Sequence, residues 1–425
     1  MKILVVTNLY PPHHIGGYEL GCRDVVEKLR ARGHAVRVLT SAFRHDDRPL
    51  VEMDVERSLQ FAAAGPSPDQ RAGCGKLANA MRRFSPDVVY FWNQSGLCRW
   101  LPVAARWRGC CAVFFLSDTN FVSWRVGAFL ARFAGKKHDP LTPAHSPSDG
   151  ERVAGRPGEG HGLVSKLVQF LFGKTFLVRG WPVIQNQPCH FASEFLRDLA
   201  QKNGMRIAEK NSLVAHWGID LPPFAVATRE RWPARRLLYV GQMIPQKGVH
   251  TAIAAFAMLA QETGFETLTF TLAGGGMHPE YEKKLRALPA ELGVAGRVQF
   301  LGRVPRAELP RVYAEHDVLV FPSEWDEPFA ITPLEAMASG LAVVGTTTGG
   351  SGELFRNRET AMTFCAGDAA DGARAIRELC GDRELFETIR RHGQREVREK
   401  HTLDAMVDKI EAGLQSLKAE ARSRA

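Results

Sequence analysis

Short apolar runs and amphipathic helical stretches alternate along almost the whole chain. A short apolar run between turns predicts a strand that is buried on both faces. Apolar positions spaced three and four residues apart predict a helix with one buried face. Because strands and helices alternate, we predict the α/β fold class, with doubly wound parallel sheets.

This alternation starts at the N-terminus and restarts once. In the first half, KILVVTN predicts a strand, and ELGCRDVVEKLRARGH predicts a helix that ends at Gly33. The further strands predicted in this half are AVRVLT, PDVVYFW, CAVFFLSD and NSLVAHWGID. A second series begins near residue 225 with RRLLYVGQ and continues with LTFTLAGG, RVQFLG, DVLVFPS and LAVVGTT.

The restart predicts two Rossmann-like domains, 1–220 and 221–400, which face each other across a cleft at the carboxyl ends of their strands. The remaining segment, 401–425, is predicted to be helical and to pack back toward the first domain. Residues 135–162 are rich in Pro, Gly and charged residues, and they are predicted to form a mobile loop in the first domain.

Composition places the chain among soluble proteins. With 425 residues, of which 45% are apolar and 24% charged, it can build two full-sized cores. The N-terminus has no signal-peptide pattern and no apolar stretch reaches membrane-spanning length, so we expect a cytoplasmic protein. The eight cysteines show no CxxC spacing and the net charge of +9 is spread along the chain. We therefore expect reduced thiols and no zinc site. Charge alone does not choose between a nucleic acid, an anionic lipid and a phosphorylated substrate as partner, and no nucleic-acid partner is predicted.

Three short segments that follow predicted strands suit ligand binding. Gly16 and Gly17 stand before a helix start, where the backbone is open and an anion is favoured, although a simple turn explains them equally well. Lys247 in YVGQMIPQKG is placed for a diphosphate, although a loop lysine is usually just solvated. The cluster 274–276, which contains Gly275, lacks the GxGxxG order. We interpret it as a turn that gives a ligand access to the backbone.

The segment SEWDEPFAITPLEAMASG, 323–340, carries two glutamates eight positions apart, Glu327 and Glu335. Thr332, Pro333 and Glu335 match a capping box, with Thr332 at the N-cap and Glu335 bonded back to the backbone. Glu327 precedes this helix, and we expect it to have no structural role. A carboxylate beside the amides of a helix start suits a sugar nucleotide, because it accepts sugar hydroxyls while the amides face phosphate.

Several segments together resemble one enzyme family. They are YPPHHIGGYELGCRDVVEKLRARGHAVRVLT, PDVVYF, HFASEFLRD, HWGID, YVGQMIPQKGVHTAIAAF and VQFLGRVPRAELPRVYAEHDVLVFPSEWDEPFAITPLEAMASGLAVVGTTTGGSGEL. With these motifs the chain resembles the retaining glycosyltransferases of family 4, in the glycosyl transferases group 1, which have the two-domain GT-B fold. Glu327 and Glu335 match the E-x7-E signature of that family.

The resemblance implies a transferase that moves a sugar from a UDP, GDP or ADP sugar to a glycan or lipid-linked acceptor, without a metal or another cofactor. The acceptor would belong to cell-surface polysaccharide or glycolipid biosynthesis. By the same resemblance, the first domain would bind the acceptor and the second the nucleotide sugar.

Roles for single residues follow from the resemblance too. Glu327 would hold the donor sugar, Glu335 would hold the ribose, and Lys247 would neutralise the departing diphosphate. Gly16 and Gly17 would let the first domain close over the donor. The other implied donor contacts are Gln242, Gly275, Val304, Phe329, Ala330, Ile331 and Thr332.

Three positions depart from the family pattern. Gln242 stands where many members have an arginine beside the diphosphate, and Ala330 replaces the usual glycine. Ser117 stands where many members have a histidine near the donor sugar, and Asp118, which follows it, is a further catalytic candidate. Gln242 would leave Lys247 with less help at the diphosphate, and Ala330 would tighten the sugar pocket. We interpret Ser117 as a sign of a variant sugar or acceptor site.

The sequence leaves three functions open. They are a retaining transferase, a sugar-nucleotide epimerase or sugar-phosphate synthase on the same fold, and a non-catalytic nucleotide-sugar binder. The segment SKLVQFLFGKTFLVRGW, 165–181, mixes basic and apolar residues, which predicts either a core helix or a helix on an anionic membrane surface. In the second case the protein would contact the inner face of the plasma membrane peripherally.

Overall fold

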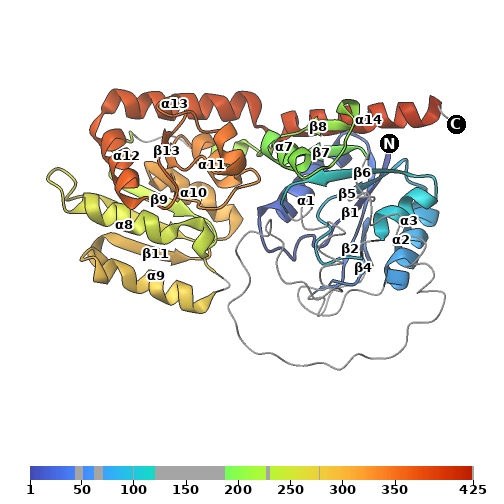
Figure 1. The fold of residues 1–425 in the computed structure, drawn as a ribbon, viewed down its shortest axis with the longest axis horizontal. Helices are drawn as coiled ribbons and strands as arrows, with labels where there is room; N and C mark the ends of the chain where they lie inside the picture. Colours follow the sequence, from blue (N-terminus) through green and yellow to red (C-terminus); the bar gives the residue numbers. More distant parts are fainter. Residues whose placement is uncertain are drawn as a thin grey trace.

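The computed structural model describes residues 1–43, 51–61, 70–98, 100–119, 187–225, 230–276 and 278–423. Two sheets with their helices lie side by side along the long axis of the molecule (Figure 1). The predicted loop at 135–162 and the segment 165–181 lie outside the described residues. The predicted α/β class with two Rossmann-like domains is confirmed.

The first sheet has eight strands in the order β3-β4-β2-β1-β5-β6-β7-β8, and all neighbours are parallel except β3 and β4. Its central strands are buried along their length, as their continuous apolar runs predict. The elements of this half are β1 Lys2–Val6, α1 Gly17–Ala31, β2 Ala35–Ser41, β3 Val51–Glu52, β4 Val55–Leu59, α2 Gln70–Phe84, β5 Val88–Phe91, α3 Leu101–Trp107, β6 Cys111–Leu116, β7 Cys189–Phe191, α7 Glu194–Lys202, η1 Glu209–Asn211, β8 Ser212–Val214 and η2 Pro222–Phe224.

The second sheet has six parallel strands in the order β11-β10-β9-β12-β13-β14. Helices cover both of its faces, and a second hydrophobic core fills the space beneath them. The elements of this half are β9 Arg236–Val240, η3 Pro245–Lys247, α8 Val249–Ala260, β10 Thr269–Ala273, α9 Pro279–Glu291, η4 Ala295–Arg297, β11 Val298–Gly302, η5 Arg306–Glu308, α10 Leu309–Glu315, β12 Val318–Phe321, α11 Ile331–Ala338, β13 Ala342–Gly345, η6 Gly349–Glu353, β14 Met362–Thr363, α12 Ala369–Gly381 and α13 Arg383–Lys400.

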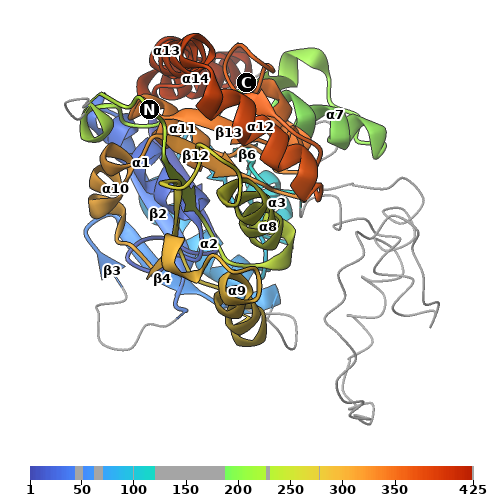
Figure 2. The ribbon, with the colours of Figure 1, turned by 90° about the vertical axis from the view of Figure 1, so that its left-hand side faces the viewer.

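The chain crosses between the two halves twice, and the two crossing segments lie against each other. The amide of Ile219 donates to the carbonyl of His401 at 3.0 Å, and the amide of Leu403 donates to the carbonyl of Ile219 at 2.8 Å. After the second crossing, α14, Leu403–Ser423, packs against α1 of the first half. Figure 2 shows α13 and α14 along the same side of the molecule. The last helix therefore ties the second half back to the first.

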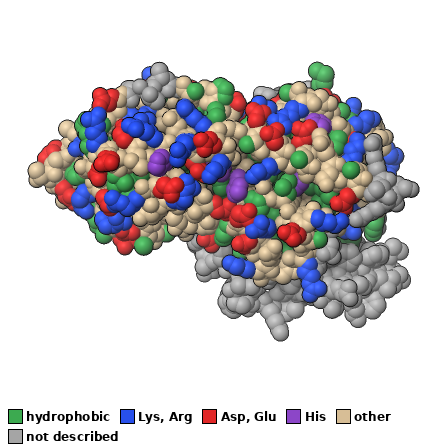
Figure 3. Space-filling view, turned by 90° about the horizontal axis from the view of Figure 1, so that it is seen from above, with side chains coloured by type: hydrophobic (Ala, Val, Ile, Leu, Met, Phe, Trp, Pro, Cys, Tyr) green, Lys and Arg blue, Asp and Glu red, His purple; other side chains and the backbone are tan. Residues whose placement is uncertain are grey.

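Charges of both signs share the face that α13 and α14 cover. Figure 3 looks down on this face, and among its described side chains Lys and Arg are interspersed with Asp and Glu. The net charge of +9 therefore does not gather into one basic patch on this face. Within the described ranges, no helix has the length and apolar character needed to cross a membrane.

The close packing of the two crossings predicts a sensitive glycine. A Cβ atom on Gly218 would lie 2.1 Å from the carbonyl oxygen of Thr402, which is backbone and cannot turn away. We expect Gly218→Ala to destabilise the protein by about 1–3 kcal/mol and to lower its melting temperature. Gly296→Ala is the matched control, because a Cβ there meets nothing within 4 Å. Equal melting temperatures for the two variants would show that the crossings do not constrain each other.

Candidate active site

Segments that follow four parallel strands of the second sheet meet at one edge. Lys247 follows β9, Gly275 follows β10, Val304 follows β11 and Glu327 follows β12. Because β11, β10, β9 and β12 are neighbours and parallel, their carboxyl ends lie at the same edge of the sheet. The structure therefore brings these four predicted donor residues to one edge.

An ion pair between Lys247 and Glu327 lies at the centre of this edge. The ammonium Nζ of Lys247 is 2.5 Å from Oε1 of Glu327, and the hydroxyl of Ser323 donates to the same oxygen at 2.6 Å. Glu327 is only 5% exposed, whereas about a quarter of the Lys247 side chain is exposed. The expectation that Glu327 has no structural role is wrong, because this buried carboxylate satisfies two donors.

The backbone around Glu327 is fixed as well. The amide of Gly350 donates to the carbonyl of Glu327 at 2.6 Å. A Cβ on Gly349 would lie 2.4 Å from that carbonyl, and a Cβ on Gly350 would lie 2.3 Å from the carbonyl of Pro328. Only glycines allow η6 to approach this closely, so the glutamate-bearing loop and η6 form one compact unit.

Helix α11 starts at Ile331, two residues before the predicted start at Pro333 with Thr332 as N-cap. Its N-cap is Ala330, which offers no side-chain acceptor, and Thr332 lies inside the first turn. The amides of Ile331 and Thr332 therefore receive no side-chain cap and have no acceptor within the helix. The predicted capping box is wrong, and the uncapped helix start suits an anion better than the predicted one would.

Glu335 bonds to a side chain instead of the backbone. Its Oε2 accepts a hydrogen bond from the hydroxyl of Tyr313 at 2.9 Å, and both side chains are buried. Burial raises the pKa of Glu335 to about 7, although the Tyr313 hydroxyl and the charge of Arg306 act in the opposite direction. Tyr313 lies on α10, far from Glu335 in the sequence, so sequence patterns do not identify it.

The glycines after β10 bring two loops together. A Cβ on Gly274 would lie 1.8 Å from the carbonyl of Gly241, and the amide of Met243 donates to the carbonyl of Gly275 at 3.2 Å. This contact positions the loop that carries Gln242. Nε2 of Gln242 donates to the carbonyl of Ile15 in the first half at 3.3 Å. Gln242 therefore bridges the two halves in this structure.

The edge that carries Lys247, Gly275, Val304 and Glu327 is called the donor edge below. The first half contacts it through the loop before α1. A Cβ on Gly17 would lie 3.1 Å from Cδ1 of Ile331, so the two chains approach closely there. The amide of Gly16 is not open to a phosphate in this structure. It donates to Oε2 of Glu19 at 2.9 Å, and the amide of Ile15 donates to Oε1 of Glu19 at 3.3 Å.

Polar side chains stand two residues past the ends of three neighbouring strands of the first sheet, β1, β5 and β6. They are Asn8, Asn93 and Asp118. Nδ2 of Asn93 donates to Oδ2 of Asp118 at 2.9 Å, and Nδ2 of Asn8 donates to the carbonyl of Ser95 at 3.1 Å. Ser117, beside Asp118, is 9% exposed. Asp118 was predicted from the sequence, but the two asparagines were not, although their placement after strand ends is a signal that could have identified them.

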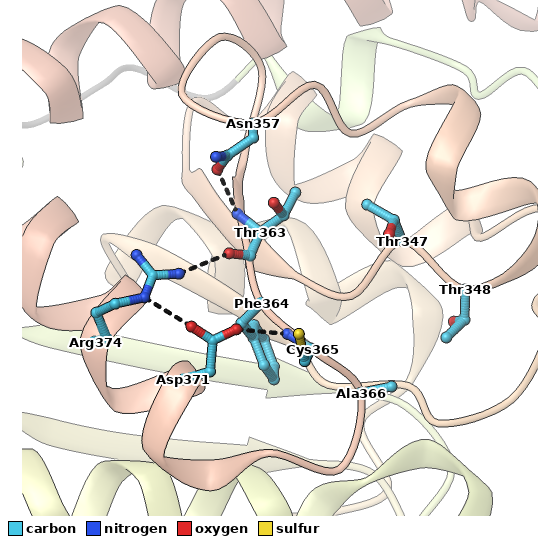
Figure 4. A pocket seen from close by; sticks show the side chains of 9 residues that line it. All are labelled: Thr347, Thr348, Asn357, Thr363, Phe364, Cys365, Ala366, Asp371 and Arg374. Atoms are coloured by element: carbon cyan, nitrogen blue, oxygen red, sulfur yellow. Dashed lines mark hydrogen bonds and ion pairs between the residues drawn. The ribbon is translucent and has the colours of Figure 1, made fainter.

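A polar cavity of about 390 Å³ lies beside β14 and α12 (Figure 4). Its charged side chains are already bonded to one another and to backbone. Asp371 accepts from the amide of Cys365 at 2.8 Å and from Nε of Arg374 at 2.7 Å, and Arg374 also donates to the carbonyl of Thr363. We therefore place the active site at the strand edge and not in this cavity.

Comparisons with known proteins find glycosyltransferases similar to this chain. Residues 228–396 match the model of the glycosyl transferases group 1 family. The chain is 28% identical over 393 residues to glycogen synthase of Mycobacterium tuberculosis, covering 90% of this chain and 86% of the relative. It is 27% identical over 434 residues to a D-inositol 3-phosphate glycosyltransferase of Geodermatophilus obscurus, covering 95% and 86%.

A solved structure shares the fold. The crystal structure of Anabaena HepE in complex with UDP has a TM-score of 0.69 and 21% sequence identity, over 98% of this chain and 100% of that one. The fold is GT-B. The chain is an enzyme, a glycosyltransferase.

The raised pKa of Glu335 predicts a pH dependence of stability. The folded protein holds this proton up to about pH 7, whereas the unfolded chain releases it near pH 4.5. The free energy of unfolding should therefore fall by roughly 3 kcal/mol between these pH values. In urea unfolding at several pH values, Glu335→Gln should flatten this slope. The exposed control Glu291→Gln should not, and a wild-type slope in Glu335→Gln would contradict the assignment.

Proposed function

We propose that this glycosyltransferase moves a sugar from a nucleotide-sugar donor to a hydroxyl of a glycan or lipid-linked acceptor, with retention of the anomeric configuration. The observation that carries the proposal is the Lys247–Glu327 pair beside the uncapped start of α11. An ammonium, a carboxylate and open backbone amides at one strand edge provide for a diphosphate and a sugar together. HepE, which shares the fold, was crystallised with UDP.

Catalysis at this edge would act on the leaving group. As the bond to the sugar breaks, negative charge grows on the diphosphate, and the Lys247 ammonium and the amides of Ile331 and Thr332 would stabilise it. Because Lys247 is already fixed by Glu327, little reorganisation is needed when the donor binds. Glu327 would then accept hydrogen bonds from the hydroxyls of the donor sugar.

The remaining donor residues would bind the nucleoside. Glu335 would accept the ribose hydroxyls once it is ionised, and Gly275 and Val304 would line the base. The backbone from Phe329 to Thr332 would contact the sugar and the diphosphate. The resemblance implies these roles, and the positions of the residues beside one edge of the second sheet support them.

The acceptor would bind on the side of the first domain. Asp118 can accept a hydrogen bond from an acceptor hydroxyl, and Asn93 holds its carboxylate in place. In a retaining reaction the departing phosphate oxygen can take the proton of the acceptor, so no side chain has to act as a base. We propose that the acceptor belongs to cell-surface polysaccharide or glycolipid biosynthesis.

If Lys247 binds the diphosphate, its removal should affect nucleoside diphosphates more than nucleosides. We expect Lys247→Ala to weaken the binding of a nucleoside diphosphate while leaving the binding of the corresponding nucleoside nearly unchanged, because only the diphosphate meets the ammonium. Calorimetric titration of UDP, GDP and ADP against their nucleosides measures this ratio. Lys284→Ala, on the exposed face of α9, is the control. Equal losses for diphosphate and nucleoside would place the phosphates elsewhere.

The proposed chemistry predicts different costs for two variants. Ser117 offers one neutral hydrogen bond, worth about 0.5–1.5 kcal/mol, whereas loss of the ammonium should cost about 3 kcal/mol in the transition state. Lys247→Ala should therefore lower kcat far more than Ser117→Ala, and proton NMR of fresh product should show the retained anomer in both. A larger loss for Ser117→Ala would contradict this account. Hydrolysis or epimerisation without transfer would favour the alternative enzymes on this fold.

A further inference from the structure

The carboxylate of Glu353, in the second domain, accepts three hydrogen bonds. Two come from the first domain and one from the segment that leads to the first crossing. Oε1 of Glu353 accepts from the amide of Phe195 at 2.7 Å. Its Oε2 accepts from the amide of Glu194 at 3.0 Å and from Nε2 of His216 at 2.8 Å. Glu353 is the last residue of η6, which follows β13 of the second sheet.

The two amides belong to the start of α7, which lies at the border between the domains (Figure 1). The first amides of a helix have no acceptor within it, and its N-terminus favours a negative charge. Ser193 caps the amide of Leu196 at 3.2 Å, which leaves the amides of Glu194 and Phe195 for Glu353. The helix thus obtains part of its cap from the other domain.

His216 also packs against Phe329, which lies between Glu327 and the start of α11. Its ring lies 5.3 Å from the ring of Phe329 and 5.7 Å from the ring of His401. Phe329 is 6% exposed and directly precedes Ala330, the N-cap of α11. The imidazole that Glu353 fixes is therefore packed against the segment that presents the amides of α11.

The other end of η6 contacts Glu327 itself. The amide of Gly350 donates to the Glu327 carbonyl at 2.6 Å, three residues before Glu353. Burial would raise the pKa of Glu353, yet the bonds from His216 and from the two amides of α7 hold that pKa below its usual value. The carboxylate is therefore charged at neutral pH, where its bonds are strongest.

We propose that Glu353 is a positioning residue that couples the relative placement of the two domains to the geometry of the donor site, through η6 on one side and through His216 and Phe329 on the other. When the amides of α7 and the imidazole of His216 are bonded to the Glu353 carboxylate, η6 and Phe329 hold Glu327 and the start of α11 in their present arrangement. When the first domain moves away, the bonds to Glu353 break, and neither η6 nor Phe329 is held in place any longer. This role rests on the proposed donor site, and it goes beyond that site because Glu353 is not one of the residues proposed to bind the nucleotide sugar.

Glu353→Gln tests the proposal. The glutamine keeps the size of the side chain, but its amino group meets donors where the carboxylate had an acceptor. We expect kcat/KM to fall by about tenfold or more, with most of the loss in kcat. The affinity for the nucleoside diphosphate should stay within about threefold of wild type, because the groups that bind it remain. Small-angle X-ray scattering without ligand should show a larger mean radius of gyration.

Matched variants separate coupling from plain stability. Glu291→Gln removes an exposed carboxylate of the same domain and should leave all three measurements unchanged. His216→Gln, which keeps a donor for Glu353, should retain more kcat than His216→Ala. The His216 variants leave the amides of α7 bonded to Glu353, so they test the proposal even if Glu353→Gln folds poorly.

The outcomes distinguish this proposal from the proposed function. Wild-type scattering together with wild-type kcat in Glu353→Gln would overturn the coupling. A lowered melting temperature without any change in kcat would also overturn it, because Glu353 would then serve only stability. If the wild-type protein binds no nucleoside diphosphate, the proposed function fails, while the scattering comparison still decides whether Glu353 holds the domains together.

Discussion

An ionised carboxylate can remain in a protein interior only where donors compensate for the water it has lost. Glu327 meets that condition through Lys247 and Ser323, and the arrangement of the donor edge follows from it. To compensate for the buried carboxylate, the loop after β9 supplies Lys247 and the segment after β12 supplies Ser323. The glycines of η6 allow close approach to the Glu327 backbone. The same contacts that stabilise the carboxylate fix the Lys247 ammonium at the place where we propose that the diphosphate binds.

This edge is not independent of the first domain. Gln242 bonds across to Ile15, and Arg306 forms an ion pair with Asp24 of α1 at 2.7 Å. The two chain crossings lie against each other, and α14 returns to pack on α1. Contacts of this kind restrict how the domains can move relative to each other. A change in the placement of the domains should therefore also change the geometry around Glu327.

Much of the fold follows from local pattern. Most of the longer parallel strands were predictable because they are largely apolar runs between turns, and the fold class follows from their alternation with helices. The exception is β4, VERSL, which alternates and was not predicted. The strands β3, β7 and β14 contain only two or three residues, too few for a pattern. The positions of Lys247 and Glu327 could be predicted for the same reason, since each follows a recognisable strand end.

The errors in the site have a common physical cause. The sequence from Thr332 to Glu335 matches a capping box, but the hydroxyl of Tyr313 from another helix takes the carboxylate instead. Similarly, no local pattern around Glu353 predicts its hydrogen-bond partners, which lie in the first half of the chain, more than a hundred residues away. Local patterns describe local competition for hydrogen bonds, and long-range contacts decide the outcome when both are available.

Hydrogen exchange of the protein tests whether the nucleotide sugar binds at the edge that carries Lys247 and Glu327. It would be measured with and without the nucleotide sugar that raises the melting temperature most. We expect slower exchange at the amides of 329–332, of 244 and of 246–248, which belong to the uncapped start of α11 and to the Lys247 loop. Protection confined to the polar cavity beside α12, with no change in these two segments, would contradict it.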